Sequence, residues 1–332
     1  IQEFDNAVTM TKAYEAVSDY LGFGFIEAGK TMGLAPYGVD DENIPDFFIN
    51  GRGNKNLLIP HYPAGAYIDE NTNIYLKRYI DPKEWHNDFT LVPDQSKNLA
   101  YKIQKETEEL LFELVQKAVD ITGETNIVIS GGFGLNCVAN YEFLKRFPDV
   151  NFYNEPISND AGNPIGLCKD LYRKETGCTN FKKLETLYLG PNNSNKYDEM
   201  NLDEFEIINS NSQEVAKIIY EGNIVCLYQG RSEAGPRALG NRSIICEATS
   251  PETYSILNKK LQRNDFMPFA PAVLDEDADT LFEVKKSIHT SQFMTMCYNT
   301  KPEWQDKLPT VVHPIDKTAR IQYVTKENNF LF

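Results

Sequence analysis

Residues 126–147 read NIVISGGFGLNCVANYEFLKRF, and this stretch decides the fold class. It contains a short apolar strand, a glycine-rich turn and a helix. The order then repeats, with the strand VNFYNEP (150–156), the loop ISNDAGN and the helix PIGLCKDLYRKETG. Strands, loops and helices repeated with short connections are typical of α/β architecture. Parallel strands of this kind place ligands at their carboxyl ends, where the glycine-rich loops lie.

The local pattern also predicts how these elements pack and begin. The strand over 126–130 is apolar enough to be buried, and so is NIVCLYQG (223–230) further along the chain. Asn163 is expected to cap the second helix, with Pro164 at its first position.

The clearest helix lies upstream, over Ser96–Thr122. Leu99 and Ile103 begin a row of apolar residues at helical spacing, with Lys and Glu on the opposite side. Residues 1–38 predict an opening helix that leads into a glycine-rich loop, GKTMGLAPYG. Residues 39–95 show little periodicity, and we expect an irregular insertion with two short strands.

The downstream part predicts a second unit. Residues 190–201, GPNNSNKYDEMN, form the best linker candidate because they begin with Gly-Pro and are rich in Asn. Beyond it we expect the strand over 223–230, a second strand over 242–248 and a helix over 252–262.

Composition limits the class of protein. The 332 residues suffice for two domains, and the net charge of −15 argues against a duplex nucleic-acid partner. No apolar run reaches the ~20 residues of a membrane span, so no membrane partner is expected. The six cysteines form no C-x-x-C pair, which predicts reduced, buried thiols in a cytoplasmic protein. They are Cys137, Cys168, Cys178, Cys226, Cys246 and Cys297.

A second glycine-rich loop, GRSEAGPRALGNRS (230–243), carries three arginines. Arg231, Arg237 and Arg242 stand between evenly spaced glycines. An arginine fork matches the oxygens of phosphate or carboxylate. A hydrogen bond to a charged group contributes about 1.5–3 kcal/mol, whereas an exposed ion pair contributes about 0–1 kcal/mol. Three ordered forks therefore favour a polyanion site over pairing with the surplus carboxylates of this chain.

Basic residues on the next predicted helix add charge near this loop. Lys260 and Arg263, together with Lys259, follow it closely in sequence. A solvated helix face explains these residues as well as a ligand does.

The turn SGGFGLNCVAN (130–140) is a weaker candidate. Gly131 and Gly132 precede a helix, whose positive end suits a phosphate. Neither the Walker A pattern nor the dinucleotide fingerprint is present. Asn136 could contact a ligand or cap the helix, and both interpretations stay open.

Two further loops carry residues that could either bind a ligand or serve only the fold of the loop. Asp160, in SNDAGNP, could be a metal ligand, a general base or a turn residue, and the turn is favoured from the sequence alone. In GKTMGLAPYG, Gly29, Lys30 and Gly33 could face a phosphate or form an ordinary loop. The four histidines are scattered and predict no metal centre or catalytic triad. They are His61, His86, His289 and His313.

Taken in this order, the motifs resemble those of the O-carbamoyltransferases that modify antibiotics and nodulation factors. The resemblance covers nearly the whole chain apart from residues 39–95. It rests on GKTMGLAPYG, SGGFGLNCVAN, SNDAGNPIG, GRSEAGPRALGNRSI, FMPFAPAVL and HPIDKTARIQYVT.

The resemblance implies two α/β domains joined by the linker. Residues 1–189 would be the C-terminal half of an actin/Hsp70-like (ASKHA) transferase domain, and residues 202–332 a YrdC-like domain. Such enzymes form carbamoyl adenylate from carbamoyl phosphate and ATP. The first domain, which holds iron, then passes the carbamoyl group to the hydroxyl of a small-molecule acceptor. A homodimer stays open.

Residue by residue, the resemblance assigns roles to the candidates above. Arg231, Arg237 and Arg242 would be catalytic, by neutralising charge during adenylation. Asp160 matches the aspartate ligand of the metal. Carbamoyl phosphate and ATP would be bound by the remaining candidates, namely Asn241, Ser243, Lys260, Arg263, Gly131, Gly132, Asn136, Gly29 and Gly33.

The chain departs from the family pattern in one respect. The histidine pair that supplies the other iron ligands is absent, and the chain enters the pattern part-way and stops before its end, at Phe332. We therefore expect iron only with a histidine-bearing N-terminal segment. A nucleotide-binding scaffold derived from such an enzyme, and an actin-fold kinase of small molecules, stay open as alternatives.

Overall fold

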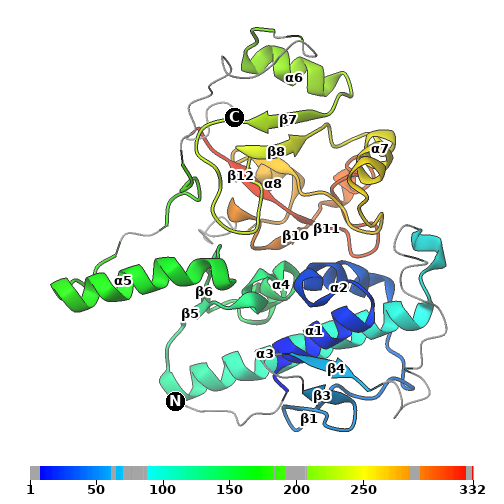
Figure 1. The fold of residues 1–332 in the computed structure, drawn as a ribbon, viewed down its shortest axis with the longest axis vertical. Helices are drawn as coiled ribbons and strands as arrows, with labels where there is room; N and C mark the ends of the chain where they lie inside the picture. Colours follow the sequence, from blue (N-terminus) through cyan, green and yellow to red (C-terminus); the bar gives the residue numbers. More distant parts are fainter. Residues whose placement is uncertain are drawn as a thin grey trace.

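The structure is a computed structural model, and its fold is mixed α/β (Figure 1). It describes residues 8–60, 65–69, 76, 85, 88–181, 184–191, 206, 208–284, 292–326 and 331. Three of the four histidines, His61, His86 and His289, lie outside this part of the chain, as does most of the expected linker over 190–201.

The elements up to residue 176 occupy the lower half of Figure 1. Its helices are α1 (Met10–Tyr20), α2 (Ala28–Leu34), α3 (Asp94–Thr122), α4 (Cys137–Arg146) and α5 (Asn163–Thr176). Its strands are β1 (Phe48–Ile49), β2 (Arg52–Gly53), β3 (Leu58–Pro60), β4 (Ala66–Ile68), β5 (Asn126–Ile129) and β6 (Asn151–Asn154). Short 3₁₀ turns are η1 (Phe25–Glu27), η2 (Ala35–Tyr37), η5 (Phe89–Leu91), η6 (Gly132–Leu135) and η7 (Asp160–Gly162).

The elements from residue 212 onward lie above α2 and α4 in Figure 1. The helices are α6 (Ser212–Tyr220), α7 (Pro251–Leu261) and α8 (Ala278–Leu281), with the 3₁₀ turn η10 (Pro302–Trp304). The strands are β7 (Val225–Tyr228), β8 (Arg242–Ile245), β9 (Ala272–Leu274), β10 (Cys297–Asn299), β11 (Thr318–Arg320) and β12 (Gln322–Val324).

The described strands form pairs. β5 with β6 and β9 with β12 are parallel. β1 with β2, β3 with β4, β7 with β8 and β10 with β11 are antiparallel. The parallel β5–α4–β6 unit confirms the α/β alternation that opened the sequence analysis. The 39–95 region holds four short strands, β1 to β4, where we expected two.

The long helix is also confirmed, since α3 runs from Asp94 to Thr122. It ends because Gly123 adopts a left-handed conformation with φ 70°, which glycine adopts without strain. Its apolar side packs against α1 and α4, and Leu99 and Ile103 are fully buried there.

Two predictions of burial were wrong. The thiols are not all buried, since Cys168 on α5 and Cys226 on β7 are exposed. The strand over 223–230 is not buried either, because Cys226 and Tyr228 lie on an uncovered face of β7.

Three further local predictions were wrong. The expected loop over 29–38 is largely helical and forms α2 and η2. Because Gly33 has no side chain, Met267 packs directly against the backbone of α2. β5 is not buried, since Val128 is 69% exposed on its uncovered face. Asn163 does not cap α5, because the turn η7 runs straight into the helix and places Asn163 at helical dihedral angles.

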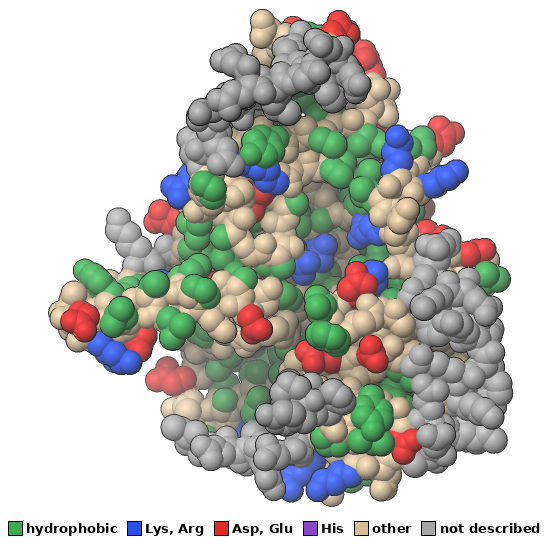
Figure 2. Space-filling view, viewed as in Figure 1, with side chains coloured by type: hydrophobic (Ala, Val, Ile, Leu, Met, Phe, Trp, Pro, Cys, Tyr) green, Lys and Arg blue, Asp and Glu red, His purple; other side chains and the backbone are tan. Residues whose placement is uncertain are grey.

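The two halves meet through the core and through polar contacts. Asn140 on α4 donates hydrogen bonds to the carbonyls of Gly134 and Thr295, both under 3 Å. His313 Nε2 lies 3.0 Å from the carbonyl oxygen of Gly33. α5 extends away from the body and exposes Leu167 and Leu171 (Figure 2). Among the described residues, every helix is too short or too polar to span a bilayer.

Candidate functional site: an arginine-lined cavity

The arginine loop begins where β7 ends and finishes where β8 starts. The two strands are antiparallel, with Tyr228 opposite Arg242, so the loop closes over one end of the pair. Gly235 has φ 97°, and a side chain there would press against Ile157 at 3.1 Å. Glycine is therefore required at this point, both for the turn and for close packing against the segment after β6.

Two of the three arginines hold the loop together. Arg231 donates from Nε to the carbonyl of Gly190 (2.7 Å) and from Nη2 to that of Leu189 (2.9 Å). Arg242 donates from Nη1 to the carbonyl of Gln229 (2.6 Å), and its guanidinium stacks over Tyr228 at 3.7 Å from the ring centroid. The donors of both side chains are thus directed at the backbone of the chain.

Glu233 is the loop's internal anchor. One carboxylate oxygen accepts hydrogen bonds from the backbone N–H groups of Leu239 (2.8 Å), Asn241 (2.8 Å) and Arg242 (3.1 Å). Burial opposes the charge of this carboxylate, yet the backbone hydrogen bonds prevail and lower its pKa.

The predicted ligand-binding residues Asn241 and Ser243 also take part in holding the loop. Asn241 is buried and donates from Nδ2 to the carbonyl of Arg231 at 2.7 Å. The Ser243 hydroxyl accepts a hydrogen bond from the N–H of Gly240 at 2.8 Å, and Ser243 also lines a cavity beside the loop.

The third arginine of the loop, Arg237, faces a cavity of about 350 Å³. Two arginines from distant parts of the sequence, Arg263 after α7 and Arg320 on β11, line the same cavity. Arg263 donates to the carbonyl of Pro268 at 3.0 Å and stacks over Phe269. Figure 2 shows basic side chains on this face where the upper and lower halves meet.

Arg237 and Arg320 each carry a buried hydrogen-bond donor that the described residues leave unsatisfied. In each, the Nε atom is buried without a hydrogen bond among the described residues. Described arginines elsewhere do form ion pairs, as Arg146 does with Glu109 and Arg173 with Asp170. A buried donor without a partner costs free energy, so the cavity is arranged for a group that is anionic and rich in oxygen.

The charges of the three arginines oppose one another. The Arg320 charge, and then burial, lower the pKa of Arg237 to about 10. Burial, and then Arg320, lower the pKa of Arg263. A guanidinium is a cation at neutral pH, and a polyanion would relieve both the repulsion and the unmet hydrogen bonds. Lys260, in contrast, is exposed on α7 and does not line this cavity.

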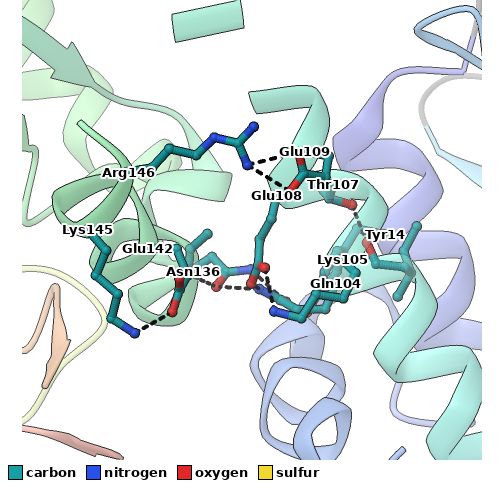
Figure 3. A network of polar contacts seen from close by, with 12 residues as sticks. Tyr14, Gln104, Lys105, Thr107, Glu108, Glu109, Asn136, Glu142, Lys145 and Arg146 are labelled. Atoms are coloured by element: carbon teal, nitrogen blue, oxygen red, sulfur yellow. Dashed lines mark hydrogen bonds and ion pairs between the residues drawn. The ribbon is translucent and has the colours of Figure 1, made fainter. Parts of the chain in front are cut away.

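The glycine turn of the lower half is held by a buried polar network (Figure 3). Asn136 caps α4 by accepting from the N–H of Ala139 (3.0 Å), and its Nδ2 donates to Gln104 Oε1 (3.0 Å). Gln104 in turn donates to Glu108 (2.7 Å) and accepts from the Tyr14 hydroxyl (2.7 Å).

The side-chain oxygen and nitrogen of Asn136 both form hydrogen bonds within the protein. Gly131, at φ 97°, and Gly132 have open space where a side chain would begin, so the backbone of the turn remains approachable. Gly29 is likewise open, whereas Gly33 packs against Met267.

Asp160 is exposed at the start of η7. Burial raises the pKa of the Glu15 carboxyl, Lys12 lowers it, and the charge of Asp160 raises it further, so the charges of Glu15 and Asp160 interact. No cluster of three or more His, Cys, Asp or Glu side chains able to hold a metal occurs in the described part of the chain. These residues therefore do not supply the ligand set that iron requires.

Sequence reasoning missed Arg320 and Glu233. Glu233 stood inside the quoted loop, but its role depends on backbone N–H directions that the sequence does not show. Arg320 follows Arg237 by more than eighty positions, and the fold of β11 brings the two together.

Comparisons with known proteins agree with this arrangement. The carbamoyltransferase N-terminus family matches residues 2–168, and the carbamoyltransferase C-terminus family matches residues 216–332.

Full-length relatives are similar over nearly the whole chain. Nodulation protein NolNO of Sinorhizobium fredii is 30% identical over 98% of this chain and 48% of its own length. An uncharacterized protein of Methanocaldococcus jannaschii is 32% identical over 95% of this chain and 52% of its own. Nodulation protein NolO of Bradyrhizobium diazoefficiens is 28% identical over 93% of this chain and 56% of its own length. The chain spans about half the length of these relatives, and it belongs to the carbamoyltransferase family.

Proposed function

We propose that this chain is part of an O-carbamoyltransferase that uses carbamoyl phosphate and ATP. The proposal rests on one observation above all: Arg237, Arg263 and Arg320 line one cavity, and the buried Nε atoms of Arg237 and Arg320 have no hydrogen-bond partner among the described residues. Both substrates are polyanions, and three guanidinium forks suit their phosphate oxygens.

In the proposed reaction, carbamoyl phosphate, ATP and one water give carbamoyl adenylate, phosphate and pyrophosphate. The carbamoyl group then passes to a hydroxyl of the acceptor, and AMP leaves. The cavity's arginines would neutralise the charge that gathers as phosphate oxygens approach one another, which is how phosphoryl transfer is mostly catalysed. Arg231, Arg242 and Glu233 would act through the loop, by holding Arg237 in place.

The same proposal includes the finer fold. Residues 1–189 would belong to an actin/Hsp70-like transferase domain and residues 202–332 to a YrdC-like domain, with 190–201 between them. The two family matches, which leave residues 169–215 between them, support this division. Gly131, Gly132 and Gly29 would offer backbone N–H groups to the adenylate on the lower side.

The proposal requires that residues outside the described part of the chain supply iron ligands. Asp160 and Glu15 provide two carboxylates at most, and a catalytic iron site needs about three protein ligands. We assign no step of the reaction to these two residues.

The decisive experiment measures pyrophosphate release by the full-length protein. With ATP present, release should require carbamoyl phosphate and should be followed by AMP when a hydroxyl acceptor is added. ATP binding without release would favour a nucleotide-binding scaffold. ADP formation at the same rate with and without carbamoyl phosphate would favour a kinase.

A further inference from the structure

Two cysteines from opposite halves of the chain meet in the core. Cys137 is the first residue of α4, and Cys297 is the first residue of β10. Their sulfur atoms are 3.0 Å apart, and the Cys297 thiol donates to Cys137. Both side chains are buried, and Met32 Sδ lies 3.9 Å from the Cys137 sulfur.

The surroundings favour one thiolate and one thiol. The hydrogen bond from Cys297 lowers the pKa of Cys137 to about 6, against the effect of burial, and the charges of Arg320 and Arg237 add to this. The same hydrogen bond and burial raise the pKa of Cys297 well above its usual range. At neutral pH the pair therefore combines a nucleophilic sulfur with a protonated neighbour.

A small cavity gives access to both sulfurs. It has a volume of about 50 Å³, and Cys137, Cys297, His313 and Arg320 are among the residues that line it. A cavity needs about 10–15 Å³ of volume measured in this way to hold one water molecule, so this cavity admits only molecules of a few non-hydrogen atoms. Hydrogen peroxide fits this limit, whereas a peptide disulfide such as oxidised glutathione does not.

We propose that Cys137 and Cys297 are a peroxide-reactive pair that closes into a disulfide across the two halves of the chain. The Cys137 thiolate attacks one oxygen of hydrogen peroxide, the O–O bond breaks, and hydroxide leaves. Cys137 is then a sulfenic acid. The Cys297 sulfur, on losing its proton, attacks the Cys137 sulfur and releases a second hydroxide. In sum, two thiols and one peroxide give one disulfide and two waters.

The geometry demands little movement for this step. A disulfide has a sulfur–sulfur distance of about 2.05 Å, so the atoms approach by roughly 1 Å from their present 3.0 Å. The bond would link α4, within the range 2–168 of the first family match, to β10, within the range 216–332 of the second. The inference does not depend on the proposed function.

The sequence allows a direct test on the full-length protein. Cleavage by trypsin after Lys and Arg, except before Pro, places each of the six cysteines on a separate peptide, with Cys137 on 118–145 and Cys297 on 287–307. The reduced protein is treated with about one equivalent of hydrogen peroxide at pH 7, alkylated, digested and analysed by mass spectrometry.

We expect the peptides 118–145 and 287–307 to be joined, and to separate on reduction. The exposed Cys168 and Cys226 are internal controls and should remain alkylated at this dose. Oxidised glutathione at the same concentration should form the link at least tenfold more slowly. Equal rates with both oxidants would overturn the role of the small cavity.

Two variants separate this route from random oxidation. A Cys168→Ser/Cys226→Ser variant should form the same link. In Cys297→Ser, whose hydroxyl can still donate a hydrogen bond to Cys137, peroxide should stop at a sulfenic acid on Cys137, which dimedone traps once the protein is unfolded. Recovery of both Cys137 and Cys297 as alkylated thiols in the wild-type protein, while Cys168 is oxidised, would overturn the proposal without any variant.

Discussion

Replacing Arg320 by methionine should make the protein more stable and its anion binding weaker. The pKa of a guanidinium in water lies well above that of Arg237 in this protein, and each pKa unit corresponds to about 1.4 kcal/mol. The Arg320 charge and burial lower the pKa of Arg237 to about 10. Keeping Arg237 charged in the folded state therefore costs on the order of 3 kcal/mol at neutral pH, and Arg320 is the largest cause.

Arg320→Met removes that repulsion and one buried, unpartnered Nε. We expect the free energy of unfolding to rise by about 1–2 kcal/mol, which raises the melting temperature by roughly 2–4 °C per kcal/mol. Loss of one charged hydrogen bond, about 1.5–3 kcal/mol, should weaken carbamoyl phosphate binding about 10- to 150-fold.

Thermal unfolding and titration calorimetry on the same preparations of the full-length protein measure both effects. Lys260→Met is the matched control, because Lys260 is an exposed cation of similar charge that does not line the cavity. It should change neither quantity appreciably. A less stable Arg320→Met variant with unchanged affinity would refute the reasoning, since Arg320 would then be a structural residue.

Three further outcomes are expected. Arg231→Ala should lower stability by about 1–2 kcal/mol in urea unfolding, because it removes two hydrogen bonds that join the loop to Gly190 and Leu189. Burial lowers the pKa of His313, so stability should fall as the pH drops below about 6.5, and His313→Gln should flatten that profile between pH 7.5 and 5.5. Iron in the full-length protein, measured after dialysis, should be lost in Asp160→Ala, and retained iron would remove Asp160 from the ligand set.

The sequence predicted the elements with strong local signals. The helix over 96–122 was recognised because its apolar residues recur at helical spacing, and the structure extends it by two residues at the start. The β5–α4–β6 unit was recognised for a similar reason, since short strands and glycine turns alternate. The glycine-rich stretch at 29–38 was misread, because its glycines serve the packing of a helix and not a loop.

The candidate site could be predicted in part. Arg237 was found from the loop that contains it, but the same pattern gave equal weight to Arg231 and Arg242, whose donors contact backbone carbonyls. Arg320 could not be found locally, because its approach to Arg237 depends on the tertiary fold of β11.

The most direct test of the proposed function is exchange of labelled pyrophosphate into ATP, which reports reversible formation of an adenylate. In the full-length protein with ATP and carbamoyl phosphate, we predict exchange that is abolished in Arg237→Ala and retained in Lys260→Ala. Equal exchange in Arg237→Ala and wild type, or exchange that does not require carbamoyl phosphate, would contradict the assignment of the arginine-lined cavity.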